Sequence, residues 1–193
     1  MQLQWDQHFR EIVLVAWRAY RVAEQRLSEA IQQGDEALIH RARFDVLREG
    51  GAASFYLHHF MDVVLRARPE WLPEDLPGGR DEIGAARKWL AEHCTFLRGD
   101  QPIGDVTLLK DVADALKHAI LDNQARRVAA NEAVLVVGTG FGELRFGEGK
   151  FGGGEQAIVL ADDGPRALSS ILQNVIDAWR RVAGLDLPAI GQP

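Results

Sequence analysis

Four polar side chains between residues 111 and 122 have the types and the spacing of a site that binds a divalent metal or transfers protons. Asp111, Asp114, His118 and Asp122 recur at intervals of three and four residues, so on a helix they share one arc. An imidazole and a carboxylate four residues apart can bind one metal ion together, or the carboxylate can orient the imidazole for acid–base catalysis. The plainer interpretation is the solvated face of an amphipathic helix, opposite its apolar arc, with Lys110 and Asp114 forming an ion pair.

A second pair of polar residues, His58 and Asp62, lies on a stripe that is otherwise apolar. The other members of that stripe are Phe44, Leu47, Gly51, Phe55 and Leu65. A buried histidine and a buried carboxylate each need a partner, so one expectation is a buried hydrogen bond between His58 and Asp62. The other is that this stripe meets the polar arc of the later helix. His58, Asp62, Asp114 and His118 would then be candidate ligands of one divalent metal ion between two helices.

The third unusual segment is rich in glycine and phenylalanine. Phe141, Phe146 and Phe151 are each followed by glycine and recur every five residues between Gly138 and Gly154. A dinucleotide-binding fingerprint needs glycine where Glu143 stands, and the segment lacks the Gly-Lys-Ser/Thr of a phosphate-binding loop. Two interpretations remain: a structural loop whose phenylalanines dock on the rest of the protein, and a flap or surface for a partner.

The first third of the chain must place these residues on two long helices. Apolar residues at three- and four-residue spacing predict one helix over 5–33 and a second over 36–66. Gly34 suits the C-terminal cap of the first helix and Asp35 the N-terminal cap of the second. The two helices should form an antiparallel hairpin about 45 Å long, from the helical rise of 1.5 Å per residue.

The rest of the chain is predicted to contain shorter elements. Three prolines and a Gly-Gly pair predict a loop over 69–81. Beyond it we expect a helix over 81–94, a helix over 106–122 with Asp105 as its cap, strands over 133–137 and 157–160, and helical structure from 163 to 182. The sequence thus predicts one domain over 1–193, a mainly α, up-down bundle of about five helices. A glycine-rich β-hairpin insertion over 126–163 precedes the last helix, and 185–193 form a loose tail.

Composition excludes several classes of protein. The chain has 193 residues, 22 Lys and Arg against 28 Asp and Glu, and a formal charge of −6, which argues against a protein that coats nucleic acid or a membrane. A lone cysteine, Cys94, excludes a disulfide framework and is expected to be a buried, inert thiol. The N-terminal residues lack the pattern of a signal peptide, and no apolar run reaches the length of a membrane span, so we expect a cytoplasmic protein.

The order of motifs in the second half resembles that of a known group of proteins. The string LLKDVADALKHAILD, the Phe/Gly-rich loop and a helix that includes Trp179 resemble an uncharacterised bacterial family with an Arg-Asp-x-Ala-Asp-Ala-x-Lys-His helix, over residues 96–183. Lys110 replaces the arginine of that string. A more distant resemblance is to the HEPN helical domains, many of which are metal-independent ribonucleases. Asp114 and His118 match half of their motif, whereas Ala113 replaces its arginine, so this resemblance implies a binding role.

The sequence leaves three functions open. The leading hypothesis is a non-enzymatic cytoplasmic interaction module of the HEPN-like type, because nucleophile and phosphate motifs are missing and five Trp residues occur in a small chain. Its partner would be another protein or a second copy of the chain, with nucleic acid less favoured. The alternative is a metal-dependent hydrolase with the His/Asp site described above. The third is a ribonuclease with His118 as general base and Asp111 and Asp114 as further catalytic candidates.

Overall fold

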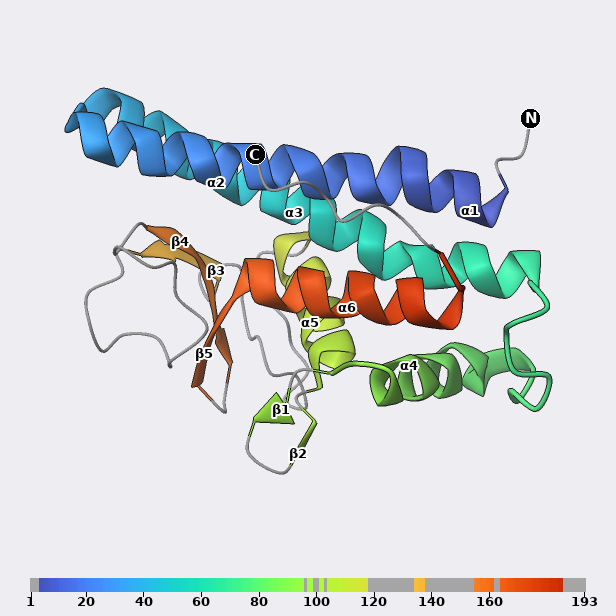
Figure 1. Cartoon of the computed structure of the whole chain (residues 1–193). Helices are drawn as coiled ribbons and strands as arrows, with labels where there is room; N and C mark the ends of the chain where they lie inside the picture. The colour runs from blue at the N-terminus through green and yellow to red at the C-terminus, as the bar shows by residue number, and fades with distance from the viewer. Residues whose placement is uncertain are drawn as a thin grey trace.

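The chain folds into a mainly α bundle with small antiparallel sheets, as a computed structural model shows (Figure 1). The structure describes residues 4–95, 97–98, 101–102, 104–117, 134–137, 155–161 and 164–185. The expected fold class, a helical bundle with a β-hairpin before the last helix, is confirmed. The Phe/Gly repeat over 138–154 and the tail from 186 lie outside the described residues.

A long helical hairpin forms one side of the molecule, along the top of Figure 1. Its first arm consists of α1 (Trp5–His8), a π-helical turn (Phe9–Val13) and α2 (Leu14–Gln33), and its second arm is α3 (Glu36–Ala67). Gly34 adopts a left-handed conformation with φ of 70°, which ends α2. The Asp35 side chain accepts hydrogen bonds from the backbone N–H groups of Ala37 and Leu38 and caps α3. Both predicted helices and both predicted caps are confirmed.

The face that α3 turns toward the core differs from the predicted one. Its buried residues are mostly small or aliphatic: Ile39, Ala42, Val46, Gly50, Ala53, Ser54, Leu57, Phe60, Met61 and Val64. A Cβ atom on Gly50 would lie 2.9 Å from Leu168 Cδ2 and 3.1 Å from Tyr20 Cε2. The predicted stripe that contains Phe44 and Phe55 is therefore a second apolar stripe, and both of these phenylalanines are exposed.

Three shorter helices pack beneath the hairpin. They are α4 (Glu82–Glu92), preceded by a 3₁₀ turn (Gly79–Asp81), α5 (Asp105–Lys117) and α6 (Leu168–Val182). In Figure 1, α6 lies below α3, and α5 contacts α3, α4 and α6. Two two-residue strands, β1 (Leu97–Arg98) and β2 (Gln101–Pro102), pair between α4 and α5. The helix predicted over 81–94 is confirmed, and α5 confirms the described part of the helix predicted over 106–122. The helical structure expected from 163 to 182 is confirmed from Leu168 onward.

A three-stranded antiparallel sheet precedes α6. Its strands are β3 (Val134–Val137), β4 (Gln156–Ala161) and β5 (Gly164–Ala167), in the order β3-β4-β5. β5 corrects the prediction that the chain becomes helical directly after 163, because Ala167 is still extended and the helix begins at Leu168. Pro165 is tolerated in β5 because this is an edge strand of the described sheet, where a proline need not donate a ladder hydrogen bond.

A fully buried ion pair joins α5 to the sheet. Arg166 of β5 donates two hydrogen bonds to the Asp105 carboxylate, at 2.9 Å and 2.7 Å, and neither side chain is exposed. The amide nitrogen of Asn174 on α6 donates to the same carboxylate at 2.7 Å, and its carbonyl oxygen accepts from the Thr95 backbone N–H. The side chain of Asp105, which was predicted as the cap of this helix, thus takes part in a buried network that links four segments.

The tryptophans lie mainly in the core rather than on a surface. Trp71 packs edge-on against Trp5 and Trp179, with ring centroids 5.0 Å and 6.2 Å apart, and it stacks on Trp89. Trp17 and Trp179 are buried. Four of the five tryptophans thus pack together at one end of the bundle, and Trp17 packs against Tyr20 of α2.

Among the described helices, none combines the length and the apolar character that crossing a membrane requires.

Candidate functional site

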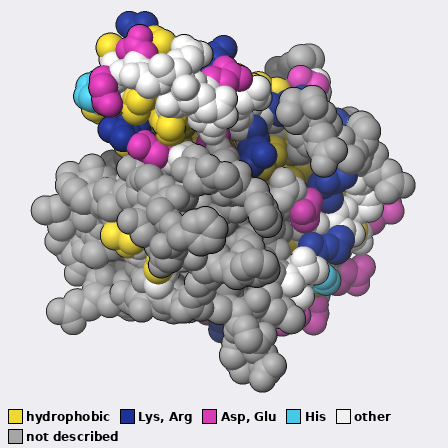
Figure 2. Space-filling model, turned by 60° about the vertical axis from the view of Figure 1, so that its left-hand side comes forward, with side chains coloured by type: hydrophobic (Ala, Val, Ile, Leu, Met, Phe, Trp, Pro, Cys, Tyr) yellow, Lys and Arg dark blue, Asp and Glu magenta, His cyan; other side chains and the backbone are white. Residues whose placement is uncertain are grey.

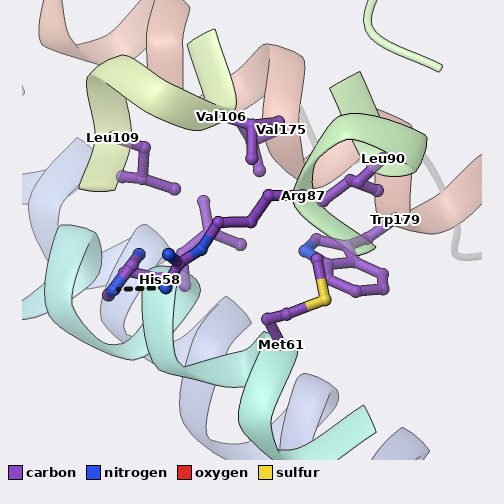
Figure 3. A pocket seen from close by; sticks show the side chains of 9 residues that line it. His58, Met61, Arg87, Leu90, Val106, Leu109, Val175 and Trp179 are labelled. Carbon is purple, nitrogen blue, oxygen red and sulfur yellow. Dashed lines mark hydrogen bonds between the residues drawn. The ribbon is translucent and has the colours of Figure 1, made fainter. Parts of the chain in front are cut away.

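Polar side chains from two helices meet beside a small cavity in the core. His58 of α3 and Arg87 of α4 point toward one another, and the Arg87 guanidinium donates a hydrogen bond of 3.4 Å to His58 Nε2 (Figure 3). The cavity has a volume of about 10 Å³, which is about the space of one water molecule. Apart from His58 and Arg87 its lining is apolar, with residues from α3, α4, α5 and α6: Leu57, Met61, Leu90, Val106, Leu109, Val175 and Trp179.

His58 is held in its neutral form. Burial lowers its pKa to about 4, and electrostatic interactions with Arg87 and His59 act in the same direction. The carboxylates of Asp114 and Asp62 oppose this shift but do not reverse it. Because arginine only donates, the Nε2 atom of the neutral imidazole accepts the bond from Arg87 and the proton is on Nδ1.

Arg87 is half-buried, and burial lowers the pKa of its guanidinium. Asp62, Asp114 and Asp111 oppose that shift through their negative charges. Asp114 on the polar arc of α5 is thus electrostatically coupled to both His58 and Arg87, and α5 contacts both α3 and α4. The expected convergence of this arc with the stripe of His58 and Asp62 stays a prediction. Arg87 supplies a cation beside His58 that sequence reasoning did not assign to the site.

The predicted hydrogen bond between His58 and Asp62 is wrong. Asp62 is exposed, and its carboxylate lies 3.0 Å from Nδ1 of His59 instead. On a helix, residues three and four apart share a face. Asp62 therefore can contact either His58 or His59, and it contacts His59, three residues before it. The ring of His59 also packs against Phe55, with centroids 4.4 Å apart.

On α5, the predicted solvated face is partly buried. Asp111 is only 2% exposed, which overturns the solvated-face interpretation for this residue. The predicted ion pair between Lys110 and Asp114 is confirmed at 3.2 Å, and Lys110 Nζ also lies 3.4 Å from Asp111. The catalytic and metal-ligand candidate His118 and its neighbour Asp122 lie outside the described residues, so the predicted ligand set of His58, Asp62, Asp114 and His118 stays a prediction.

The described residues do not by themselves form a metal site. In the described ranges, no three His, Cys, Asp or Glu side chains lie close enough together to bind one ion. Cys94 is a buried free thiol whose pKa burial raises to about 12, which agrees with the expected inert cysteine. Within the described ranges, the His, Asp and Glu side chains thus do not complete a metal centre, and the buried Cys94 thiol is not activated as a nucleophile.

The second apolar stripe of α3 forms an open groove next to this polar cluster. Phe44, Phe55 and Tyr56 are 62%, 40% and 41% exposed, which is unusual for large aromatic side chains. We call the hollow between them the α3 groove. Its volume is about 550 Å³, and its lining consists of Phe44, Leu47, Arg48, Gly51, Ala52, Phe55, Tyr56 and, from α5, Ala113.

The turn end of the hairpin also exposes mixed side chains. Figure 2, in which this end comes forward, shows hydrophobic side chains next to basic and acidic ones. On α3, Arg48 forms ion pairs with Asp45 and Glu49, and Arg43 forms an ion pair with Glu155 beside β4. Most of the basic residues on this part of α3 thus have an acidic partner, so the surface is not a basic patch.

Comparison of the chain with family models, with curated proteins and with solved structures finds no match. The candidate sites are therefore defined by the geometry of this chain alone.

Proposed function

We propose that the chain is a non-enzymatic, cytoplasmic protein-interaction module that binds its partner through the α3 groove. The observation that carries this proposal is the cluster of exposed aromatic side chains, Phe44, Phe55 and Tyr56, around a floor of Gly51 and Ala52. Aromatic residues are enriched in the buried centres of protein interfaces, where they contribute large contact areas. An exposed apolar groove of this kind is typical of a recognition surface.

The dimensions of the groove suit an amphipathic helix as the occupant. Phe44 and Phe55 are eleven residues apart on one helix, which corresponds to about 16 Å along its axis. A partner helix of about three turns can place apolar side chains at positions i, i+3 or i+4, and i+7 along that length. The small residues Gly51 and Ala52 leave room for such a side chain between the aromatic rings.

The binding role also agrees with the chemistry of the polar cluster. His58 is neutral and hydrogen-bonded to Arg87, and the cavity beside them is too small for a substrate. The HEPN-like resemblance points the same way, because Ala113 replaces the arginine of the ribonuclease motif.

The proposal is tested by selecting helical peptides from a displayed library against the wild-type chain. Affinities of the selected peptides are then measured by fluorescence anisotropy for three proteins. We expect the Phe44→Ser/Phe55→Ser variant to lose at least tenfold in affinity, about 1.4 kcal/mol. A Val15→Ser/Val22→Ser variant, which changes two exposed apolar residues on α2, should bind like the wild type. Peptides that bind all three proteins equally would contradict the proposal.

The metal-dependent hydrolase is the second candidate, and one observation favours it. The carboxylates of Asp62 and Asp114 affect the pKa of His58, although these three predicted ligands are not close enough to one another to bind an ion by themselves. Elemental analysis of the purified protein tests this candidate. A stoichiometric transition metal that is lost in both His58→Ala and His118→Ala variants would support the hydrolase over the interaction module.

A further inference from the structure

The exposed face of α3 is complementary to itself. We propose that the α3 groove binds the same groove of a second copy, with the two α3 helices antiparallel and a twofold axis beside Gly51 and Ala52. This inference rests on the proposed interaction function and names the partner of that site.

The order of side chains along α3 supports this pairing. Exposed and half-buried residues recur at three- and four-residue spacing along one face: Arg41, Phe44, Arg48, Gly51, Ala52, Phe55, His59 and Asp62. When a second α3 runs in the opposite direction, the order of the facing residues is reversed. An axis between Gly51 and Ala52 then sets each residue of the first half opposite one of the second half.

The two central residues permit a close approach. Gly51 of one copy faces Ala52 of the other, and side chains this small allow two helix backbones to come near each other. One step outward, Arg48, whose guanidinium also pairs with Asp45 and Glu49 of its own helix, faces Phe55, and a guanidinium over an aromatic ring is a favourable contact. Phe55 of the second copy is thereby placed over the groove of the first, between Phe44 and Gly51.

The outer residues are complementary in the same arrangement. Phe44 faces His59, so two rings meet at each end of the central contact. Arg41 faces Asp62, and both side chains are exposed. In an isologous dimer each of these contacts occurs twice. A parallel arrangement would instead bring Arg41 next to Arg41 and Asp62 next to Asp62, and like charges directly opposite each other cost affinity.

Cysteine cross-linking tests the position of the axis. Ala52→Cys is expected to form a disulfide-linked dimer under mild oxidation, because the two copies of residue 52 lie beside the axis. Ala37→Cys is the matched control, since it is also exposed on α3 but lies about 40 Å from its own copy in an antiparallel pair, at 1.5 Å per residue. The buried native Cys94 is present in both variants.

A charge exchange tests the register. Sedimentation equilibrium at up to about 100 µM is expected to show a dimer for the wild type. Arg41→Asp and Asp62→Arg should each raise the dimer dissociation constant several-fold, and the double variant should restore it. Circular dichroism establishes that each variant is folded.

The outcomes separate the self-pairing from the broader function. A wild-type monomer over the whole concentration range, equal cross-linking of both cysteine variants, or a double variant that is weaker than both single variants would overturn the self-pairing. If the chain is a monomer but peptide binding still depends on Phe44 and Phe55, the interaction function holds and its partner is a different protein. If peptide binding is also independent of these residues, both proposals fail.

Discussion

At the scale of single residues, His58 links the stability of the protein to pH. Its pKa is lowered from 6.5 to about 4, so between these values the unfolded chain binds a proton that the folded chain does not. The contribution of His58 to stability should therefore be largest above pH 6.5 and should be lost as the pH drops toward 4. The loss amounts to roughly 2–3 kcal/mol at pH 4.5, at about 1.4 kcal/mol per unit of pKa.

Urea unfolding at pH 7 and pH 4.5 measures this contribution. We expect the His58→Gln variant to lose less stability between the two pH values than the wild type. Arg87 of α4, Asp114 of α5, and His59 and Asp62 of α3 are present in both proteins and cancel in the comparison. His40→Gln, at an exposed position on the same helix, is the control and should keep the wild-type pH dependence. Equal pH dependence in all three proteins would contradict the assignment.

Gly50 is a second residue whose effect is local. A methyl group there would lie 2.9 Å from Leu168 and 3.1 Å from Tyr20, and both of these side chains are buried. Gly50→Ala is therefore expected to lower the free energy of unfolding by about 1–3 kcal/mol. Gly84 also lies within a helix, and a Cβ atom added there would have no other heavy atom within 4 Å. Because alanine favours a helix more than glycine does, Gly84→Ala should raise the free energy of unfolding by about 0.5–1 kcal/mol. Thermal unfolding of both variants checks the difference in sign.

At the scale of elements, the buried pair of Asp105 and Arg166 holds α5 against β5. Asp105→Asn leaves a buried guanidinium beside a neutral amide, and we expect a loss of about 3–5 kcal/mol in denaturant unfolding. The double variant Asp105→Leu/Arg166→Met removes both charges and should be more stable than Asp105→Asn. If the double variant is less stable than the single one, the pair is not the main interaction that these side chains provide.

The helices could be predicted from the sequence more fully than their contacts. The bounds of the hairpin follow from periodicity and from the caps Gly34 and Asp35, which are local signals. The choice of the packed face of α3 is not local, because two apolar stripes compete. Gly50 marks the packed one, but it has no side chain that contributes to a hydrophobic pattern. β5 was missed because Gly164 and Pro165 are typical of a turn, whereas its pairing with β4 depends on the tertiary structure.

The candidate site was predicted in part for the same reason. His58 and Asp114 were identified from their spacing on separate helices, and their electrostatic coupling agrees with that prediction. Arg87 was missed because its spacing from Ile83 and Leu90, four and three residues, is that of a residue on the apolar face of the helix. A cation within an apolar repeat is itself a signal, since burying an arginine is costly unless a partner is present.

At the scale of the whole molecule, aromatic residues on the surface and in the core should contribute differently to the free energy of unfolding. Phe44 is exposed, so Phe44→Ser should change the free energy of unfolding by less than about 0.5 kcal/mol. Phe60 is buried and packs against Phe9 and Trp179. Phe60→Ala should therefore lower the free energy of unfolding by about 3–5 kcal/mol. Chemical denaturation of both variants makes this comparison. A large loss for Phe44→Ser would mean that the α3 groove belongs to the core.

The π-helical turn at Phe9–Val13 has a consequence for the far end of the bundle. A π turn takes up about one more residue than an α turn. The side chains of α1, before the turn, are therefore rotated about the helix axis relative to those of α2. The helix after the turn presents its buried face to α3, whereas Trp5 before the turn packs on Trp71 in the segment after α3. Removing one residue from the turn would restore α-helical phase and rotate Trp5 by about 100° away from Trp71. The contact between Trp5 and Trp71 therefore depends on the number of residues in the π turn as well as on their identity.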